Sequence, residues 1–404
     1  MSELLERLAP DDALPSDGFA ELRRHAQKIL MQHGFPHRKT ENWKYTPLTL
    51  LQQRSFAGTG EMGPLPAAPE LPFDAAVIRM HNGEIDPSAT KLPRGTSLTG
   101  LVADDVDVDA LVADGPNDAF AWLNLARLGQ GWKLVVDERV ERPIVLLTTV
   151  DDAFEGAVHP RLHVEIGPDS ALTLVSLQSG GGAGLHNAVL DVRMGERSKM
   201  LHVIDRSGGD TVWIEHATVR VAAGASYRAF VSDAGGALTR QDLRVSLDAP
   251  EARGAIHGVA TLTDRALVDY HTTIEHHVGP SQSAESFRIL ADDRATGVFN
   301  GRILIVPGAD DSHSEMNTGN LLLSENARIN TKPELEIHAE DVTASHGATI
   351  GQLDDDARFY LCSRGLSERE ATALLKYGFA AAVFDDLEPG PLADWLLERL
   401  KARA

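Results

Sequence analysis

Cysteine is nearly absent from this sequence, because Cys362 is the single cysteine among 404 residues. One thiol cannot form an internal disulfide, and it cannot supply the paired cysteines of zinc or redox motifs. The N-terminal stretch also lacks the basic region and apolar run of a secretory signal, and no uncharged apolar run reaches the roughly 18 residues that a membrane span needs. These absences predict a protein of the reducing cytoplasm.

Positive charge is scarce as well. The chain has 38 Lys and Arg against 59 Asp and Glu, which gives a formal net charge of −21. Such a surface repels phosphate backbones and anionic lipid, so nucleic acid and membranes are poor partner hypotheses. The hydrophobic content of 43% in a chain of this length is that of a globular protein with a large core.

The familiar catalytic motifs are missing. The sequence contains no GxxxxGK[ST] phosphate loop, no G-x-S-x-G nucleophile turn and no H-E-x-x-H zinc motif. We therefore expect no catalytic residues in this chain, and any use of ATP would belong to a partner.

A degenerate repeat organises the middle of the chain. Short alternating segments between about residues 133 and 350 predict strands. Turn sequences separate them at a spacing of 28, at 167–170, 195–198, 223–226, 251–254 and 279–282, with a slip of one residue at 308–311. A period that holds two strands is too short for a propeller blade and favours a β-helix of about eight coils, roughly 40 Å long. An ordinary antiparallel sandwich is the alternative.

The flanks of this repeat predict helical domains. Residues 1–130 form an N-terminal helical or mixed domain, with helices near 19–30 and 118–128 and a Gly/Pro/Ala-rich connector at 57–74. Residues 131–352 form the β-helix core, and residues 353–404 form a C-terminal helical domain. There, Ser367 and Glu370 make a capping box, and a last helix follows Pro391. We expect the helices at both ends to cap the rod.

Histidines are the remaining candidates for chemistry. His271, His276 and His277 are dense in sequence, but strand geometry separates them, so we interpret them as structural. The run Asp354–Asp356 alternates in direction and is typical of a hydrated loop. His346 lies among small residues that leave its imidazole reachable, although a lone histidine supplies one ligand where transition metals want several. Residue chemistry alone therefore favours a structural role for His346 too.

Several motifs resemble one known family, the SufB/SufD proteins of iron–sulfur cluster assembly. The N-terminal segment 38–48 (RKTENWKYTPL) resembles the SufD branch rather than the cysteine-richer SufB branch. The most specific block is 320–387, and weaker matches lie at 118–147 and 269–305. The block contains the segments NLLLS (320–324), NTKPELEI (330–337), DV (341–342), SHGAT (345–349) and SRG (363–365).

This resemblance implies a mainly β protein, a right-handed parallel β-helix with two strands per coil of about 28 residues and helical terminal domains. It implies a non-catalytic scaffold subunit of a SUF-type complex with SufB and the ATPase SufC, which dock at an open strand edge and at residues 353–404, respectively. His346 matches a histidine linked to cluster assembly at the SufB junction, and so becomes a candidate cofactor-binding residue and transient iron ligand. The implied cofactor is a transient iron–sulfur cluster at the complex interface, with none held tightly by this chain alone.

The sequence departs from its relatives at one relevant place. Many relatives carry a cysteine two residues before this histidine, whereas this chain has Ala344. Cys362 matches no family ligand, and we interpret it as a small buried residue. Two alternatives stay open beside the scaffold: a β-helix carbohydrate-active enzyme, and a plain homodimeric structural protein.

Overall fold

The computed structural model describes residues 2–8, 15–37, 39–56, 70–87, 90–108 and 118–403. Of the predicted connector at 57–74, residues 57–69 lie outside the described part of the chain.

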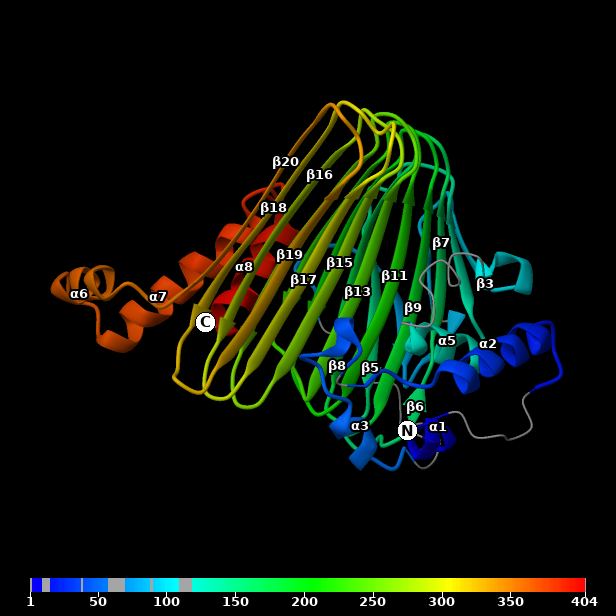
Figure 1. Cartoon of the computed structure of the whole chain (residues 1–404), viewed down its shortest axis with the longest axis horizontal. Coiled ribbons are helices and arrows are strands. Elements are labelled where there is room, and N and C mark those ends of the chain that lie inside the picture. The colour runs from blue at the N-terminus through cyan, green and yellow to red at the C-terminus, as the bar shows by residue number, and fades with distance from the viewer. Residues whose placement is uncertain are drawn as a thin grey trace.

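Two large sheets wind around a common core (Figure 1). Sheet A contains, in spatial order, β2 (Glu84–Ile85), β1 (Ala76–His81), β5 (Ile144–Val150), β8 (Ala171–Gly180), β10 (Lys199–Arg206), β12 (Ser226–Asp233), β14 (Arg253–Leu262), β16 (Gln282–Ala291), β18 (Ser312–Leu322) and β20 (Val342–Gly351). Sheet B contains β19 (Arg328–Ile337), β17 (Thr296–Ile305), β15 (Leu267–His276), β13 (Leu238–Leu247), β11 (Val212–Val221), β9 (Leu185–Met194), β7 (Arg161–Ile166), β4 (Trp132–Val136) and β3 (Thr96–Gly100), and β6 (Ala157–Val158) pairs with β9.

Consecutive strands alternate between the sheets, and successive coils pair in parallel. The predicted parallel β-solenoid with two strands per coil is therefore confirmed, and the antiparallel sandwich is excluded. Antiparallel pairing occurs at the N-terminal end, where β2 joins β1 and β3 joins β4. These N-terminal strands belong to the same two sheets as the repeats.

Tight turns set the coil period. Each turn closes with a backbone hydrogen bond from the fourth residue to the first, as from Ser170 to Gly167 and from Ser198 to Gly195. The next two turns begin at Ala222 and Ala249, so the period is 28, 27 and 27 residues. The predicted turn at 251–254 was therefore displaced by two residues, because Arg253 already begins β14. Backbone closure, and not sequence identity, defines where each turn lies.

The strand alternation builds the core. On each strand every second side chain points into the solenoid, so that aligned positions of successive coils stack in columns. The apolar members of these columns, such as Val192, Val219 and Val245 on sheet B, are fully buried. Regular stacking is what allows weakly matching repeats to share one core.

The N-terminal helices cover sheet B. They are α1 (Ser2–Leu8), α2 (Ala20–His33), η1 (Glu41–Trp43), α3 (Thr49–Gln53), η3 (Ala103–Asp105) and α5 (Ala119–Ala126). The two predicted helices correspond to α2 and α5, and Asp118 caps α5 by accepting a hydrogen bond from the Ala121 amide. Phe120 and Trp122 of α5 belong to the same buried cluster as Leu185 of β9. This layer lies on the outer face of the solenoid.

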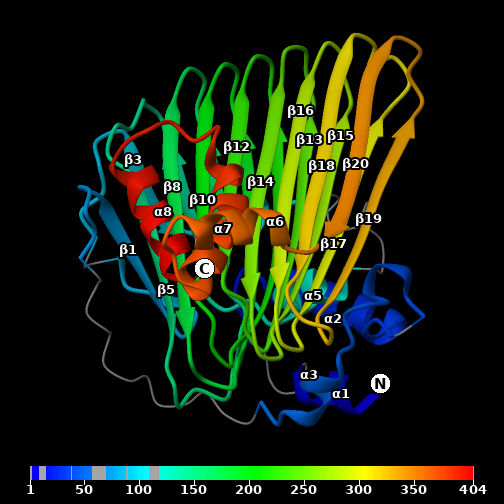
Figure 2. The same cartoon turned by 90° about the vertical axis from the view of Figure 1, so that its left-hand side faces the viewer.

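The C-terminal helices cover sheet A, where α7 and α8 lie across its strands (Figure 2). They are α6 (Asp355–Ser363), α7 (Glu368–Ala381), η5 (Ala382–Phe384) and α8 (Pro391–Arg403). Leu396 and Leu400 of α8 are buried in one cluster with Leu147, Val203 and Phe230, which project outward from the sheet. The predicted capping box of Ser367 and Glu370 is confirmed.

The expectation that C-terminal helices cap the rod was wrong for the described residues. The apolar stripe of α8 is complementary to the outward apolar row of sheet A, which the sequence pattern did not distinguish from an end of the rod. The last coil, made by β19 and β20, is left uncovered. No described helix is both long and apolar enough to cross a bilayer.

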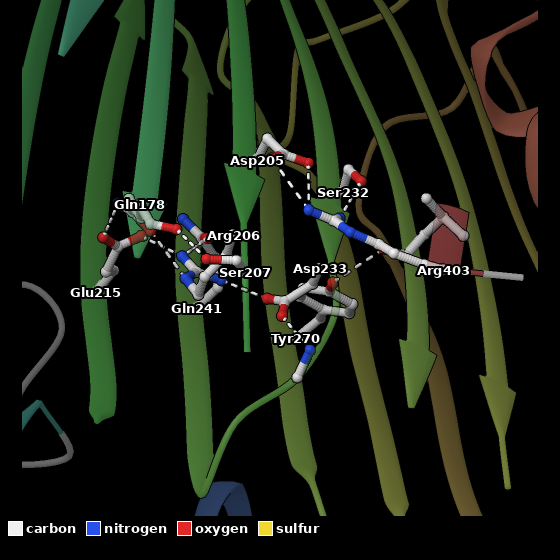
Figure 3. Close-up of polar contacts among 12 residues, drawn as sticks. Gln178, Asp205, Arg206, Ser207, Glu215, Ser232, Asp233, Gln241, Tyr270 and Arg403 are labelled. Atoms are coloured by element: carbon white, nitrogen blue, oxygen red, sulfur yellow. Dashed lines mark hydrogen bonds and ion pairs between the residues drawn. The ribbon is translucent and has the colours of Figure 1, made fainter. Parts of the chain in front are cut away.

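A charged cluster lies inside the solenoid (Figure 3). Arg206 of β10 is fully buried, and its guanidinium donates to Gln178 at 2.8 Å, to Glu215 at 2.6 Å and also to Asp233. Gln178 in turn donates to Glu215. The cluster joins sheet A to sheet B across the interior, and each charge has a partner of opposite sign.

The neighbouring Asp205 faces outward and holds α8. Its carboxylate accepts from Arg399 at 2.7 Å and pairs with Arg403 at 3.0 Å, and Arg403 also donates to Ser232 (Figure 3). Asp205 is completely buried by this contact. One strand thus links the interior cluster to the C-terminal helix.

We expect Arg206→Met to lower the free energy of unfolding by about 3–5 kcal/mol, because Glu215 and Asp233 would keep their buried charges without a partner. Urea unfolding followed by circular dichroism measures this loss. The control is Arg302→Met, since Arg302 pairs with Glu336 at the surface, where such pairs contribute about 1 kcal/mol or less. Equal losses in the two variants would contradict the assigned role.

Buried histidines predict a pH dependence of stability. Desolvation lowers the pKa of His159 and His186 to about 3, and that of His202 and His276 to about 4. In the unfolded chain these imidazoles regain a pKa near 6.5 and take up protons that the folded state refuses. Stability is therefore greatest above pH 6.5 and falls as the pH drops toward 4.

We expect His202→Gln to remove one proton from this dependence, so that the slope of unfolding free energy between pH 6.5 and 4.5 falls by about 1.4 kcal/mol per pH unit. His313→Gln, at an exposed position on β18, should leave the slope unchanged. Chemical denaturation at several pH values gives both slopes. The interpretation fails if the two variants show the same slope as the unmodified protein.

Candidate interaction site at the open end of the solenoid

The last coil ends in two strand edges without a neighbour. β20 pairs with β18 and β19 pairs with β17, and beyond them no described strand continues either sheet. The inward positions of this coil include Ile337 and Ile350, which are 41% and 47% exposed. Equivalent positions one coil below, Ile305 and Asn320, are buried. The end therefore has the pattern of an interior that lacks its next layer.

His346 lies in the middle of this open coil. In the ladder it is aligned with Met316 of β18, whose side chain is fully buried and points into the solenoid. His346 therefore occupies an inward column, and its side chain is exposed because no coil covers it. Ala344 shares this face, aligned with the inward Ser314. A cysteine at position 344 would thus stand beside the imidazole on the same face.

Two further groups lie in the column below His346. Met316 is next, and Gly301 makes room for its sulfur, since a Cβ at Gly301 would come within 2.9 Å of that atom. Glu285, aligned with Met316, is 2% exposed, and neither carboxylate oxygen has a hydrogen-bond partner. Desolvation raises the pKa of Glu285 to about 8. At neutral pH this interior position is therefore predominantly uncharged.

The sequence repeat carried a signal for this column. Positions 285, 316 and 346 are 31 and 30 residues apart, close to one coil, and all three fall on the inward face. Met316 and Glu285 could have been placed beneath His346 from the period alone. We missed them because the turn register drifts by one to three residues per coil.

A hydrogen-bonded ladder stiffens the coil beneath position 344. Ser314 contacts Ser283 at 2.7 Å, and Ser283 contacts Nε2 of His276 at 2.9 Å. The other ring nitrogen of His276 lies 2.7 Å from Ser281. This arrangement confirms the structural interpretation of His276, whose two nitrogens are both satisfied.

The other two histidines of that group are separate from it. His271 lies 3.0 Å from Asp269 on the outer face of sheet B, and His277 lies 3.3 Å from Glu275. Within the described residues, no group of three or more His, Cys, Asp or Glu side chains is arranged to hold a metal ion. His346 can contribute one nitrogen ligand, and a complete site needs further ligands from another molecule.

The acidic run and the cysteine differ from expectation. Asp354 is the N-cap of α6, and its carboxylate accepts from the amides of Asp356 and Ala357. It therefore has a capping role that the hydrated-loop interpretation omitted. Cys362, predicted to be buried, is only partly buried in α6. The hairpin that contains it explains the difference.

The helices α6 and α7 form an arm that projects from the face of sheet A (Figures 1 and 2). Three large apolar side chains on it are exposed: Phe359 at 75%, Tyr360 at 56% and Leu374 at 48%. Leu374 was predicted to lie on the buried stripe of α7. A projecting hairpin has too few neighbours to bury both of its faces.

Comparison with known proteins agrees with this architecture. Residues 148–379 match the model of the SUF system FeS cluster assembly SufBD core domain. The chain is 27% identical over 397 residues to the iron–sulfur cluster assembly protein SufD of Escherichia coli, covering 95% of this chain and 92% of that protein. It is 30% identical over 403 residues to a SufBD family protein of Synechocystis, covering 92% and 87%.

A shorter match is stronger in identity: 42% over 95 residues to the SufD protein of Bacillus subtilis, which covers 24% of this chain and 22% of that protein. The family model covers more than half of the chain, and the E. coli and Synechocystis matches extend over nearly all of it. The chain therefore belongs to the SufBD family of iron–sulfur cluster assembly proteins, as a SufD-type member.

Proposed function

We propose that this chain is a non-catalytic scaffold subunit of a SUF-type complex, in which a SufB-like subunit pairs with its open end and a SufC-like ATPase docks on its C-terminal arm. The observation that carries the proposal is the uncovered last coil, with His346 exposed on its inward face. A nascent iron–sulfur cluster is the cargo assembled at that junction. Family membership supports the role in cluster assembly.

The open edges suit a partner with the same architecture. β19 and β20 present main-chain donors and acceptors that a further parallel coil can pair, and the exposed Ile337 and Ile350 would then be buried. A related solenoid provides such a coil. A second copy of this chain offers similar edges, so we expect a homodimer when the SufB-like subunit is absent.

His346 would then lie between two stacked interiors. A neutral imidazole there can ligate iron through one nitrogen, while the remaining ligands come from the partner and from sulfide. Ala344 provides no thiolate, so any cysteine ligand must also come from the partner. The subunit thus contributes a single ligand and the apolar surface that surrounds it.

We expect His346→Ala to reduce cluster formation in the reconstituted complex by at least about tenfold, because a metal site loses a ligand while the exposed position imposes no folding cost. Incorporation of iron and sulfide measures the effect, and gel filtration checks that the complex still assembles. His313→Ala, an exposed histidine on the adjacent strand that points outward, is the matched control.

Full cluster formation by His346→Ala would contradict the ligand role. It would leave a plain structural partner as the better description of this subunit. Failure of the unmodified chain to join a SufB-like subunit would contradict the pairing itself.

The arm supplies the second proposed contact. Phe359, Tyr360 and Leu374 are exposed on a hairpin that extends away from the solenoid, which is a typical setting for a protein-docking surface. The arm continues into α8, which Arg399 and Arg403 fix to Asp205. Movement of a docked ATPase would therefore act on sheet A through this ion-paired helix.

We expect Phe359→Asp to abolish co-purification with the SufC-like ATPase, since a charge would replace an apolar contact, while pairing with the SufB-like subunit persists. Met31→Asp is the control, because Met31 is an exposed apolar residue on α2, far from the arm in sequence and layer. Retention of the ATPase by Phe359→Asp would place the docking surface elsewhere.

A further inference from the structure

A hollow of about 580 Å³ lies between the outer face of sheet A and the segment that enters α8. Four basic side chains line it, and we call it the basic hollow: Arg139, Lys199, Arg228 and Arg253. It is distinct from the open end and from the exposed face of the arm. Its volume falls in the range of small-molecule pockets, about 300–1,000 Å³.

The cations of the basic hollow are unusual in so acidic a chain. Arg139, Lys199 and Arg253 are exposed, and among the described residues none of the three forms an ion pair. The lining contains two acids, Glu141 and Glu388, so its formal charge is four minus two, or +2, in a protein whose net charge is −21. A concave surface with uncompensated positive charge attracts anions.

Strand register holds three of these cations in one row. Arg139 bridges to Ala171, which pairs with Lys199, and Lys199 pairs through Ser226 with Arg253. Every second strand of the row therefore carries a cation, at a spacing of about 10 Å between Cα atoms. Flexible side chains at this spacing can meet two or more separate anionic groups of one ligand. They are too far apart for mutual neutralisation by a single short acidic residue.

Arg228 fixes the opposite wall. Its guanidinium donates to the carbonyl oxygen of Asp386 and lies over the ring of Phe230. The segment from Leu387 to Ala393, which includes the first turn of α8, closes the hollow on that side. Amides in a first helical turn lack intrahelical acceptors and favour anions, which adds to the positive character of this wall.

The remaining lining is apolar. Leu201 of β10, Leu392 and the two prolines that flank Gly390 contribute it. A ligand that matches the whole surface combines negative groups with an apolar ring or chain. Simple inorganic anions would use only part of the site.

We propose that the basic hollow binds a nucleotide-sized phosphorylated small molecule, with its phosphates on the row of Arg139, Lys199 and Arg253 and its apolar ring against the α8 segment. The occupied strands β8 to β14 have neighbours on both sides, so an acidic peptide cannot add to them as a further strand. The strongly negative net charge disfavours an anionic membrane surface.

The experiment uses ADP without magnesium as the probe, titrated into the purified full-length chain in a calorimeter at low and at moderate salt. We expect binding that weakens with salt, and we expect adenosine to bind at least tenfold more weakly. The triple variant R139Q/K199Q/R253Q should lose at least tenfold in ADP affinity. All three positions are exposed, and thermal unfolding verifies that the variant is folded.

The matched control is R265Q/R294Q/R369Q, which removes the same charge from exposed arginines outside the hollow. It should bind ADP like the unmodified chain. Three outcomes overturn the proposal: no ADP binding at millimolar concentration, equal weakening in both triple variants, or binding of a hexaglutamate peptide in place of ADP. The last would assign the hollow to an acidic protein partner.

Discussion

The parallel ladder between successive coils is the interaction on which this structure depends. Each coil is ordered by the coil beneath it, because its backbone groups and its inward side chains are completed only by a neighbour. The chain resolves this requirement at its beginning, where antiparallel strands end the two sheets. At the other end it does not, and β19 and β20 retain both unpaired edges and exposed inward residues. A surface that is incomplete by the rules of its own fold is the natural place for a partner.

The same regularity makes the interior unusual. In an irregular core a buried arginine finds its partners by chance of packing, whereas here Arg206, Gln178 and Asp233 occupy neighbouring inward columns. Desolvation of these groups is costly, and the cluster is tolerable because each charge is paired and hydrogen bonded across the two sheets. Placing Asp205 next in sequence, on the outward face, connects this point to α8. Interior order and attachment of the C-terminal helices therefore converge on one strand.

Much of the architecture followed from local pattern. Strand alternation and the spacing of turns predicted a solenoid with two strands per coil, and Ser367 with Glu370 predicted the start of α7, because these signals lie within a few residues of each other. The position of α8 did not follow. Its apolar face is complementary to outward residues such as Val203 and Phe230, which belong to coils nearly two hundred residues earlier. Sequence periodicity shows that a helix has a buried face, but it does not show against which surface that face is buried.

The site was predicted in part, for the same reason. His346 was identified by family resemblance, whereas its direction depends on the register that aligns it with Met316, and its exposure depends on the absence of a covering coil. Glu285 acquires its raised pKa only from burial two coils below. An imidazole above an uncharged, apolar column faces a medium of low polarity once a partner covers it, and there any bound cation interacts strongly with its few ligands. The geometry therefore favours a junction in which neither chain alone holds the cluster, because this chain supplies one ligand and the environment while the other chain must supply the rest.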